Sequence, residues 1–196
     1  MTERESLSVH ELDELPAAEA GGLLATCCGA RAWVDRMLKR RPFGDVEGLL
    51  RAADEVWWSL GPSDWREAFA HHPRIGERAA AAVQDERARA WSAGEQRGVA
   101  AAGADARAAI ADGNREYERR FGHIYLVSAA GKSAGELLEI LRSRLANDPE
   151  TELRVAAGEQ AKITRLRLLK LLGAADGATF PDRASPSPPP SARRPR

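Results

Sequence analysis

Apolar residues recur every three or four positions along most of the chain, as far as Gly173. This spacing is typical of helices that bury one face. Asp45 stands where a helix N-cap is expected, and Gly61-Pro62 ends that helix. Asp148-Pro149 places a cap and a first-turn proline ahead of the longest helix, which Gly173 ends. The pattern predicts an all-α protein with a single compact multi-helix domain.

Three further start signals mark helices between these two. Ser63 is expected to cap a short helix that carries Trp65 and Phe69. Asp105 is expected to open a longer helix, and Ser133 with Glu136 forms a capping box ahead of another. No heptad run or internal repeat accompanies them, so the sequence does not predict a coiled coil or a repeat array.

One short segment, Phe121–Val127, departs from the helical pattern. It is rich in β-branched and aromatic residues, and no second segment of similar quality exists to pair with it as a strand. We therefore expect an extended segment packed among helices. Its backbone groups must be satisfied by side chains, water or a ligand.

The C-terminal end differs in composition from the rest. Pro181 to Arg196 contains six prolines and no apolar residue larger than alanine. Such a stretch cannot bury a core and is typical of a solvated, partly polyproline tail. We predict one folded domain over residues 1–173 and a disordered Pro/Ser/Arg-rich tail over 174–196.

Charge and cysteine usage narrow the class of protein. The 29 basic and 29 acidic residues give a net charge of zero, which disfavours nucleic-acid binding. No apolar run has the length of a membrane span, and the N-terminus lacks a signal-peptide pattern. The adjacent Cys27 and Cys28 are expected to be buried thiols. These features predict a cytoplasmic protein without membrane or nucleic-acid partners.

A first candidate for chemistry is His72, which follows the short helix and precedes Pro73. The proline restricts the histidine to an extended backbone and so holds its ring on a rigid corner. An imidazole placed in this way suits a general acid or base. The alternative is a turn histidine that bonds to the backbone.

A second candidate combines Ser92, Glu95 and Gln96, which fall on one face of a helix. A hydroxyl, a carboxylate and a carboxamide side by side can bind a polar heterocycle with several donors and acceptors. The alternative reading is that Ser92 and Glu95 form a capping box at a helix start. Capping does not account for Gln96.

A third candidate, Arg167, lies on an apolar stripe, so it either extends to solvent or binds an anion. The run Asn114–Arg120 is typical of a solvated helix face. His71, His72 and His123 have no acidic partner at ligand spacing, and nucleotide-binding and zinc-protease signatures are absent from the sequence. We therefore expect no metal site.

Six short motifs, taken in order, resemble one family. They are His72-Pro73-Arg74-Ile75-Gly76, Ser92-x-x-Glu95-Gln96-x-Gly98, Asn114-x-x-Tyr117-x-x-Arg120-Phe121-Gly122, Gly131-Lys132-Ser133, Arg144-Leu145-x-Asn147-Asp148 and Glu159-x-x-Lys162-Ile163-x-x-Leu166-Arg167-Leu168. Each motif alone is weak, but the ordered set resembles the OHCU decarboxylases. These enzymes act on 2-oxo-4-hydroxy-4-carboxy-5-ureidoimidazoline, the last intermediate between urate and (S)-allantoin.

The resemblance implies an all-helical, cofactor-free decarboxylase that forms a homodimer and takes a ureidoimidazoline substrate. It implies that His72 and Glu95 are catalytic and that Arg167 meets the substrate carboxylate. It also implies further substrate-binding positions, namely Pro73, Ser92, Gln96, Ile124 and Val127. The competing hypothesis is a non-enzymatic helical interaction module, in which the histidine and glutamate are caps and the arginine extends to solvent.

Overall fold

The computed structural model describes residues 7–76, 86–100 and 102–174. Within these ranges the chain forms ten α-helices and no strand, which confirms the predicted all-α class. The helices are α1 Val9–Glu14, α2 Ala17–Cys27, α3 Arg31–Lys39, α4 Val46–Trp58, α5 Pro62–Ala70, α6 Glu86–Glu95, α7 Arg97–Ala100, α8 Ala104–Phe121, α9 Ala134–Arg144 and α10 Pro149–Leu171. The predicted tail, apart from Ala174, lies outside the described residues.

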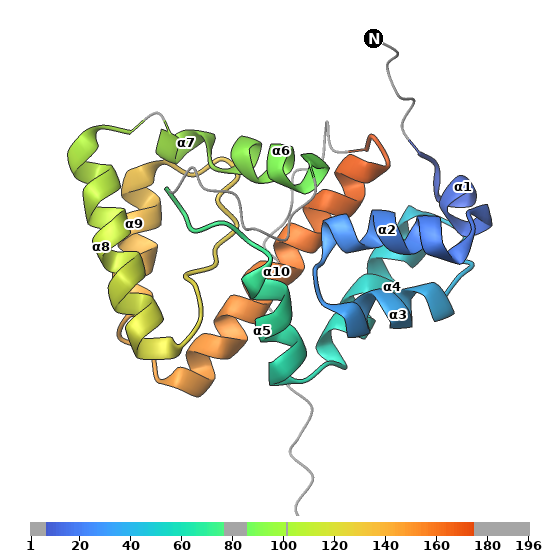
Figure 1. The fold of residues 1–196 in the computed structure, drawn as a ribbon, viewed down its shortest axis with the longest axis horizontal. Helices are drawn as coiled ribbons and strands as arrows, with labels where there is room; N and C mark the ends of the chain where they lie inside the picture. Colours follow the sequence, from blue (N-terminus) through green and yellow to red (C-terminus); the bar gives the residue numbers. More distant parts are fainter. Residues whose placement is uncertain (1–6, 77–85, 101, 175–196) are drawn as a thin grey trace, which may run out of the picture.

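The long helix α10 runs through the middle of the molecule, as Figure 1 shows. Helices α2, α3 and α4 lie on one side of it, and the antiparallel pair α8 and α9 lies on the other. The indole of Trp57 on α4 donates to the carbonyl of Ala157 on α10 over 2.9 Å. Because both flanks of α10 are covered, much of its surface is buried along its whole length.

The buried apolar residues form two clusters, one on each side of the molecule. The N-terminal core is built from α1 to α5 together with α10 and includes Trp33, Trp57 and Leu168. The hairpin core is built mainly from α8, α9 and the segment before α9, and includes Tyr117 and Leu141.

The segment between α8 and α9 has no regular structure over residues 122–129, as predicted, except that Phe121 is still the last residue of α8. Side chains satisfy two of its backbone groups. Arg144 Nη1 donates to the carbonyl of Leu126 over 2.7 Å, and Glu159 Oε2 accepts the N–H of Ser128 over 2.7 Å. Successive side chains then alternate between the cores: Leu126 joins the N-terminal core, while Tyr125 and Val127 join the hairpin core.

Several predicted helix starts are confirmed in detail. The carboxylate of Asp45 accepts the N–H of Gly48, and the carboxylate of Asp148 accepts the N–H of Thr151. Ser133 and Glu136 form the predicted capping box ahead of α9. The end of α10 is also as expected, with Gly173 in the left-handed region at φ +67°.

Two starts were predicted one or two residues too late. The N-cap of α5 is Gly61 rather than Ser63, because Pro62 occupies the first helical position. The carboxylate of Asp64 accepts the N–H of Gly61 over 3.1 Å. Helix α8 begins at Ala104, with Asp105 in its first turn rather than at its cap.

Cys27 and Cys28 are free and buried, as predicted. Burial raises the pKa of each thiol to about 12, so both are protonated at neutral pH. Among the described residues, no helix is long and apolar enough to cross a membrane.

Candidate functional site

His72 lies just past the end of α5, where the chain turns toward the hairpin. Its backbone N–H donates to the carbonyl of Phe69 over 3.0 Å, and only 8% of the residue is exposed. Burial, followed by the positive charge of Arg167, holds the pKa of His72 well below its ordinary value of 6.5. The ring is therefore neutral at physiological pH and able to accept a proton.

The loop after His72 is fixed to α8 by side chains. The guanidinium of Arg74 donates twice to the carboxylate of Glu118, over 2.6 and 2.9 Å. The amide of Asn114 donates to the carbonyl of Ile75 over 2.8 Å. Gly76 then turns the chain at φ +84°, a conformation that favours glycine. This loop is well held, which is what a positioned acid or base requires.

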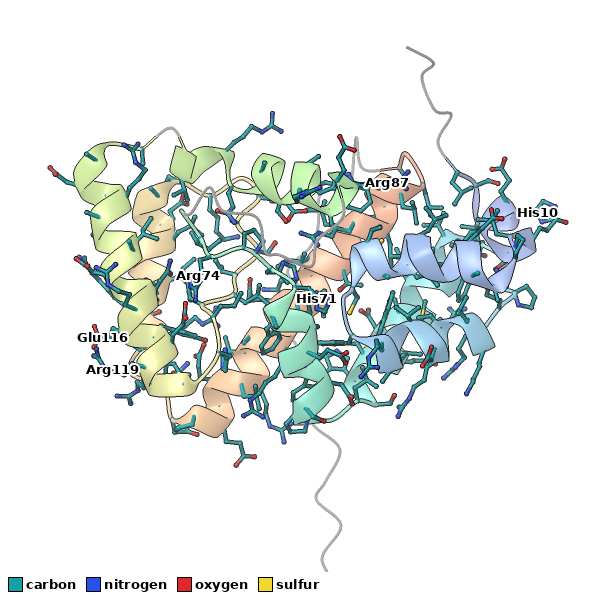
Figure 2. The ribbon with its side chains drawn as sticks, viewed as in Figure 1. His10, His71, Arg74, Arg87, Glu116 and Arg119 are labelled. Atoms are coloured by element: carbon teal, nitrogen blue, oxygen red, sulfur yellow. The ribbon has the colours of Figure 1, made fainter. Side chains whose placement is uncertain are left out.

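The predicted charged face of α8 is confirmed only in part. Arg115, Glu116 and Arg119 are exposed, and Figure 2 shows the latter two pointing outward. Asn114 and Tyr117 on the same helix are instead buried. The helix therefore presents a solvated face away from the site and a packing face toward it.

Ser92 and Glu95 lie on α6 and face Arg167 on α10. Arg167 Nη2 donates to Ser92 Oγ over 2.9 Å and to Glu95 Oε2 over 3.1 Å. Ser92 is inside α6 rather than at its start, so the capping-box interpretation is wrong. Arg167 is only 3% exposed, so it does not extend to solvent either. Its guanidinium is held where an anion can be bound.

Lys170 joins this cluster, although its position in the sequence did not single it out. Its Nζ donates to Glu95 Oε1 over 3.0 Å. The signal that could have found it is its spacing, since it follows Arg167 by three residues on the same helix. Two cations thus surround one carboxylate, and the local excess of positive charge favours an anionic ligand.

Gln96 occupies the junction between α6 and α7, and its amide is partly engaged. Its Oε1 accepts the backbone N–H of Gly76 over 3.0 Å. The residue therefore ties the end of α6 to the loop that carries His72. This contact fixes the distance between the two groups of candidate residues.

His72, Ser92, Glu95 and Gln96 line one small pocket of about 20 Å³, which lies where the two cores meet. Its walls include six of the site residues predicted from the sequence: His72, Pro73, Ser92, Glu95, Gln96 and Val127. Apolar walls come from both cores, namely Ile75, Tyr125, Leu126, Ala129 and Ile163. Arg167 is bonded to two of the polar wall residues.

Two predicted site residues do not line this pocket: Arg167, which reaches it only through Ser92 and Glu95, and Ile124. The position of Ile124 differs from the prediction. This residue is half-buried and packs against the N-terminal core. Its carbonyl lies 3.1 Å from Nδ1 of His123.

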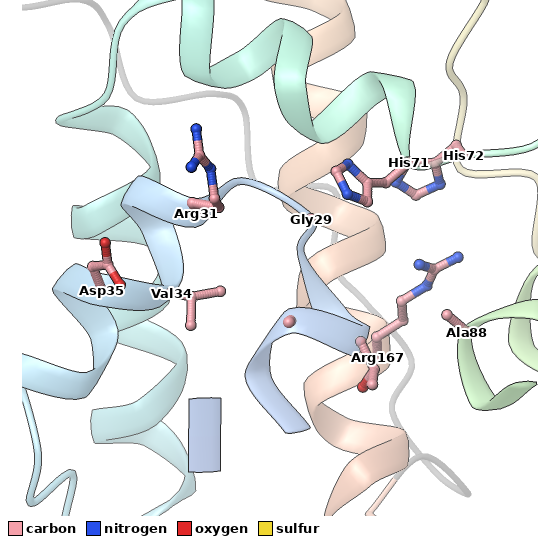
Figure 3. A pocket seen from close by; sticks show the side chains of 10 residues that line it. Gly29, Arg31, Val34, Asp35, His71, His72, Ala88 and Arg167 are labelled. Carbon is pink, nitrogen blue, oxygen red and sulfur yellow. The ribbon is translucent and has the colours of Figure 1, made fainter. Parts of the chain in front are cut away.

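A second cavity, of about 330 Å³, adjoins the same histidine and arginine from the other side. Figure 3 shows Arg167 extending from α10 toward His72 and α6. His71 lines only this second cavity, and its Nδ1 lies 2.9 Å from the carbonyl of Glu67. A Cβ added at Gly29 would come within 2.3 Å of the His71 ring, so the chain can pass here only as glycine.

The described residues contain no group of three His, Cys, Asp or Glu side chains that could hold a metal ion. In Figure 2, His10 on α1 lies at the right edge of the view, whereas His71 lies near the centre.

The comparisons with known proteins agree on one family. A sequence model of the family described as OHCU decarboxylase matches residues 13–169. The chain is 34% identical over 146 residues to the uric acid degradation bifunctional protein TTL of Arabidopsis thaliana, covering 74% of this chain and 45% of that protein. It is 33% identical over 137 residues to a putative 2-oxo-4-hydroxy-4-carboxy-5-ureidoimidazoline decarboxylase of Homo sapiens, covering 69% of this chain and 78% of that one.

A solved structure gives the same result. The crystal structure of an OHCU decarboxylase in the presence of (S)-allantoin aligns with a TM-score of 0.66 and 31% identity, covering 76% of this chain and 96% of that one. The chain spans less than half the length of the Arabidopsis relative.

Proposed function

Because the chain belongs to the OHCU decarboxylase family, we propose that it converts 2-oxo-4-hydroxy-4-carboxy-5-ureidoimidazoline to (S)-allantoin and carbon dioxide without a cofactor. One observation carries the proposal: a buried arginine, paired with Ser92 and Glu95, lies beside a neutral buried histidine at one pocket. These are the groups that a carboxylate-bearing substrate and a proton transfer require.

The substrate chemistry explains why no cofactor is needed. Its carboxylate is attached to a ring carbon next to a C=N bond. When the carbon–carboxylate bond breaks, its electron pair enters that imine, and carbon dioxide leaves. The ring nitrogen then takes a proton from solvent, which gives an enediamine-like intermediate that still carries the hydroxyl.

His72 is proposed to complete the reaction by moving one proton. As a neutral imidazole, it accepts the proton of the hydroxyl, so that a carbonyl forms. As an imidazolium, it returns that proton to one face of the ureido-bearing carbon, which sets the (S) configuration. A positioned acid–base group of this kind typically contributes about 10²–10⁴ in rate.

Arg167 is proposed to bind the departing carboxylate through a charge-assisted hydrogen bond. Lys170 adds a second positive charge, and Glu95 orients the substrate by accepting ring or ureido N–H groups. Ser92 and Gln96 are proposed to set the register of the ring.

Pro73 and Val127 are proposed to supply the apolar walls against which the ring lies. Ile124 is kept as a proposed contact through its backbone only, because its side chain faces the N-terminal core.

The assembly and location belong to the same proposal. We propose a cytoplasmic homodimer with a folded domain over residues 1–173 and a disordered tail over 174–196. The buried thiols of Cys27 and Cys28 support a reducing compartment. Light scattering after size-exclusion chromatography tests the homodimer: twice the mass of 21.3 kDa is expected, and a monomer mass would refute it.

The decisive experiment follows the optical activity of allantoin formed from urate by urate oxidase and the next hydrolase. Spontaneous decay delivers the proton to both faces and gives a racemate. With this protein present, circular dichroism is expected to show rapid formation of the (S) product. Racemic product at the uncatalysed rate, from folded protein, would refute the activity and favour the interaction module.

Two neighbouring histidines provide matched variants. His72→Asn is expected to lose most of the rate and the stereoselectivity. His71→Asn, one residue earlier and outside the proposed machinery, is expected to retain both. Equal losses in the two variants would argue against a specific role of His72.

A further inference from the structure

A buried amide on α10, Gln160, takes no part in the reaction proposed above. The residue is fully buried, and its Nε2 donates to Oγ1 of Thr164 over 3.1 Å. Its Oε1 is buried but makes no hydrogen bond in the described part of the chain. A buried acceptor without a partner is costly, and it requires an explanation.

The position of Gln160 on its helix points to His72. Gln160, Ile163 and Arg167 are separated by three and four residues, so they share one face of α10. Ile163 lines the pocket together with His72, and Arg167 borders the second cavity together with His72. The amide therefore lies on the face of α10 that carries Ile163 and Arg167, each of which shares a cavity with His72.

The contact with Thr164 determines the orientation of the Gln160 amide, that is, which of its two polar atoms points away from Thr164. Because Nε2 is the end that donates to the Thr164 hydroxyl, Oε1 is the end that remains. The Thr164 hydroxyl also lowers the pKa of the Cys28 thiol, whereas burial raises that pKa. A lowered thiol pKa is the effect of a hydroxyl that donates to sulfur. If the Thr164 hydroxyl gives its proton to sulfur, its oxygen accepts from Nε2 of Gln160, in agreement with the contact between the two side chains.

We propose that Gln160 is a positioning residue that holds His72 in a single tautomer. In this proposal the otherwise unpartnered Oε1 is the acceptor for the N–H of one ring nitrogen, so that the other nitrogen presents its lone pair to the substrate. The effect of this tautomer on catalysis rests on the proposed decarboxylation. The tautomer itself does not, because it can be observed without substrate.

The electrostatics of His72 agree with this geometry. Gln160 acts to raise the pKa of His72, as an acceptor for an imidazole N–H does, whereas burial, Arg167 and His71 lower it. The amide thus stabilises the ring N–H while the ring stays neutral. A neutral ring with one fixed proton is the form that can take a proton from the substrate hydroxyl.

Long-range proton–nitrogen NMR of the four histidine rings tests the proposal. His72→Asn assigns the two ring nitrogens of His72. In the unsubstituted protein we expect one protonated and one unprotonated nitrogen, without averaging. In Gln160→Leu we expect the two resonances to move toward each other, as the tautomers exchange. An unchanged single tautomer in Gln160→Leu would overturn the proposal, whether or not the protein is an active decarboxylase.

Kinetics add a second readout. Gln160→Leu is expected to lower kcat about 10- to 100-fold with little change in KM, since the amide does not touch the substrate. Gln160→Glu keeps an acceptor and adds a charge, so it should restore the single tautomer and move the acid limb of the pH–rate profile upward. Failure of Gln160→Glu to do either would contradict the role as acceptor.

A pair of threonine variants provides the control. Thr164→Val removes the partner that orients the amide and is expected to reproduce part of the Gln160→Leu effect on the His72 resonances. Thr26→Val changes another buried threonine, whose hydroxyl donates to the carbonyl of Leu23, and should leave those resonances unchanged. Equal effects of the two variants would show a general response to core substitution and refute the specific path.

Discussion

Arg167 and Glu95 are 72 residues apart in the sequence, yet Nη2 of the arginine lies 3.1 Å from Oε2 of the glutamate, and both side chains are more than nine-tenths buried. A buried ion pair gains little net stability from its own attraction, but breaking it leaves a costly unpaired charge. The pair therefore fixes how α6 docks on α10 and, at the same time, keeps a guanidinium inside the molecule. A site that binds a carboxylate requires both.

Arg167→Lys is expected to raise KM for the carboxylate substrate about 10- to 100-fold, because an ammonium keeps the charge but loses the fork geometry of the guanidinium. Steady-state kinetics measure the change. Arg165→Lys is the matched control, since Arg165 is on the same helix and its side chain is 43% exposed. A similar KM in both variants would show that the fork is not used.

Gly98→Ala is expected to destabilise the protein by about 1–3 kcal/mol and to impair activity, because the new Cβ would lie 2.2 Å from the carbonyl oxygen of Lys132. Relief of that clash moves the α6–α7 junction that carries Glu95 and Gln96. Urea unfolding and kcat/KM report the two effects.

Gly94→Ala serves as the control for this substitution. Nothing lies within 4 Å of a Cβ at Gly94, and the residue is inside α6. We expect about 0.5–1 kcal/mol of added stability from helix propensity. If Gly98→Ala were equally stabilising, the described approach of α7 to Lys132 would be incorrect.

The stability of the protein is expected to fall as the pH is lowered from 7.5 to 5.5. Burial holds the pKa of His72 and of His123 below the ordinary value of 6.5. Between the lowered values and 6.5, the unfolded chain binds more protons than the folded one, so the free energy of unfolding rises with pH. Each unit of lowering is worth at most about 1.4 kcal/mol.

Urea unfolding at several pH values measures this dependence. His72→Gln and His123→Gln should each flatten it, whereas His10→Gln, a change on the exposed side chain of α1, should not. A steeper loss of stability on acidification in either buried variant would reverse the assigned sign.

Glu152→Gln is expected to destabilise the protein by about 3–5 kcal/mol, because it leaves the buried Arg144 without its countercharge. Arg144 also donates to the carbonyl of Leu126, so the wall of the pocket should shift in the same variant. The double variant Arg144→Met/Glu152→Met should lose less stability than Glu152→Gln alone. If the double variant lost as much stability as the two single Met variants added together, the two groups would not interact.

Five of the ten described helices, α4, α5, α8, α9 and α10, could be predicted from start signals in the sequence because those signals are local. A cap such as Asp45 or Asp148 satisfies N–H groups only two or three residues away, so its effect does not depend on the rest of the fold. Ser63 failed because a stronger local signal competed with it. The fixed φ of Pro62 suits the first helical position, so the helix begins earlier in the sequence than Ser63 would allow.

The site could be predicted only in part, because spacing leaves each residue with two readings. Whether Arg167 extends to solvent or binds an anion depends on what packs against α10, and that is a property of the tertiary structure. The ordered motifs favoured the anion-binding interpretation of Arg167, but they gave no role to Gln160. A single glutamine on a helix carries no sign of burial in its own sequence, and its contact with Thr164 becomes visible only in the fold.

The position of the pocket between two cores has a consequence for the proposed reaction. A space of about 20 Å³ holds about one water molecule, far less than a ring with a carboxylate and a ureido group. In the proposed function, the substrate fills this pocket only when walls such as Tyr125, Leu126 and Val127 move apart, and we expect slow opening to lower the turnover rate. Looser packing would admit substrate faster but would expose the intermediate to bulk water, where either face can be protonated. Fast entry of the substrate and protonation on a single face therefore place opposite requirements on how tightly the two cores pack around the pocket.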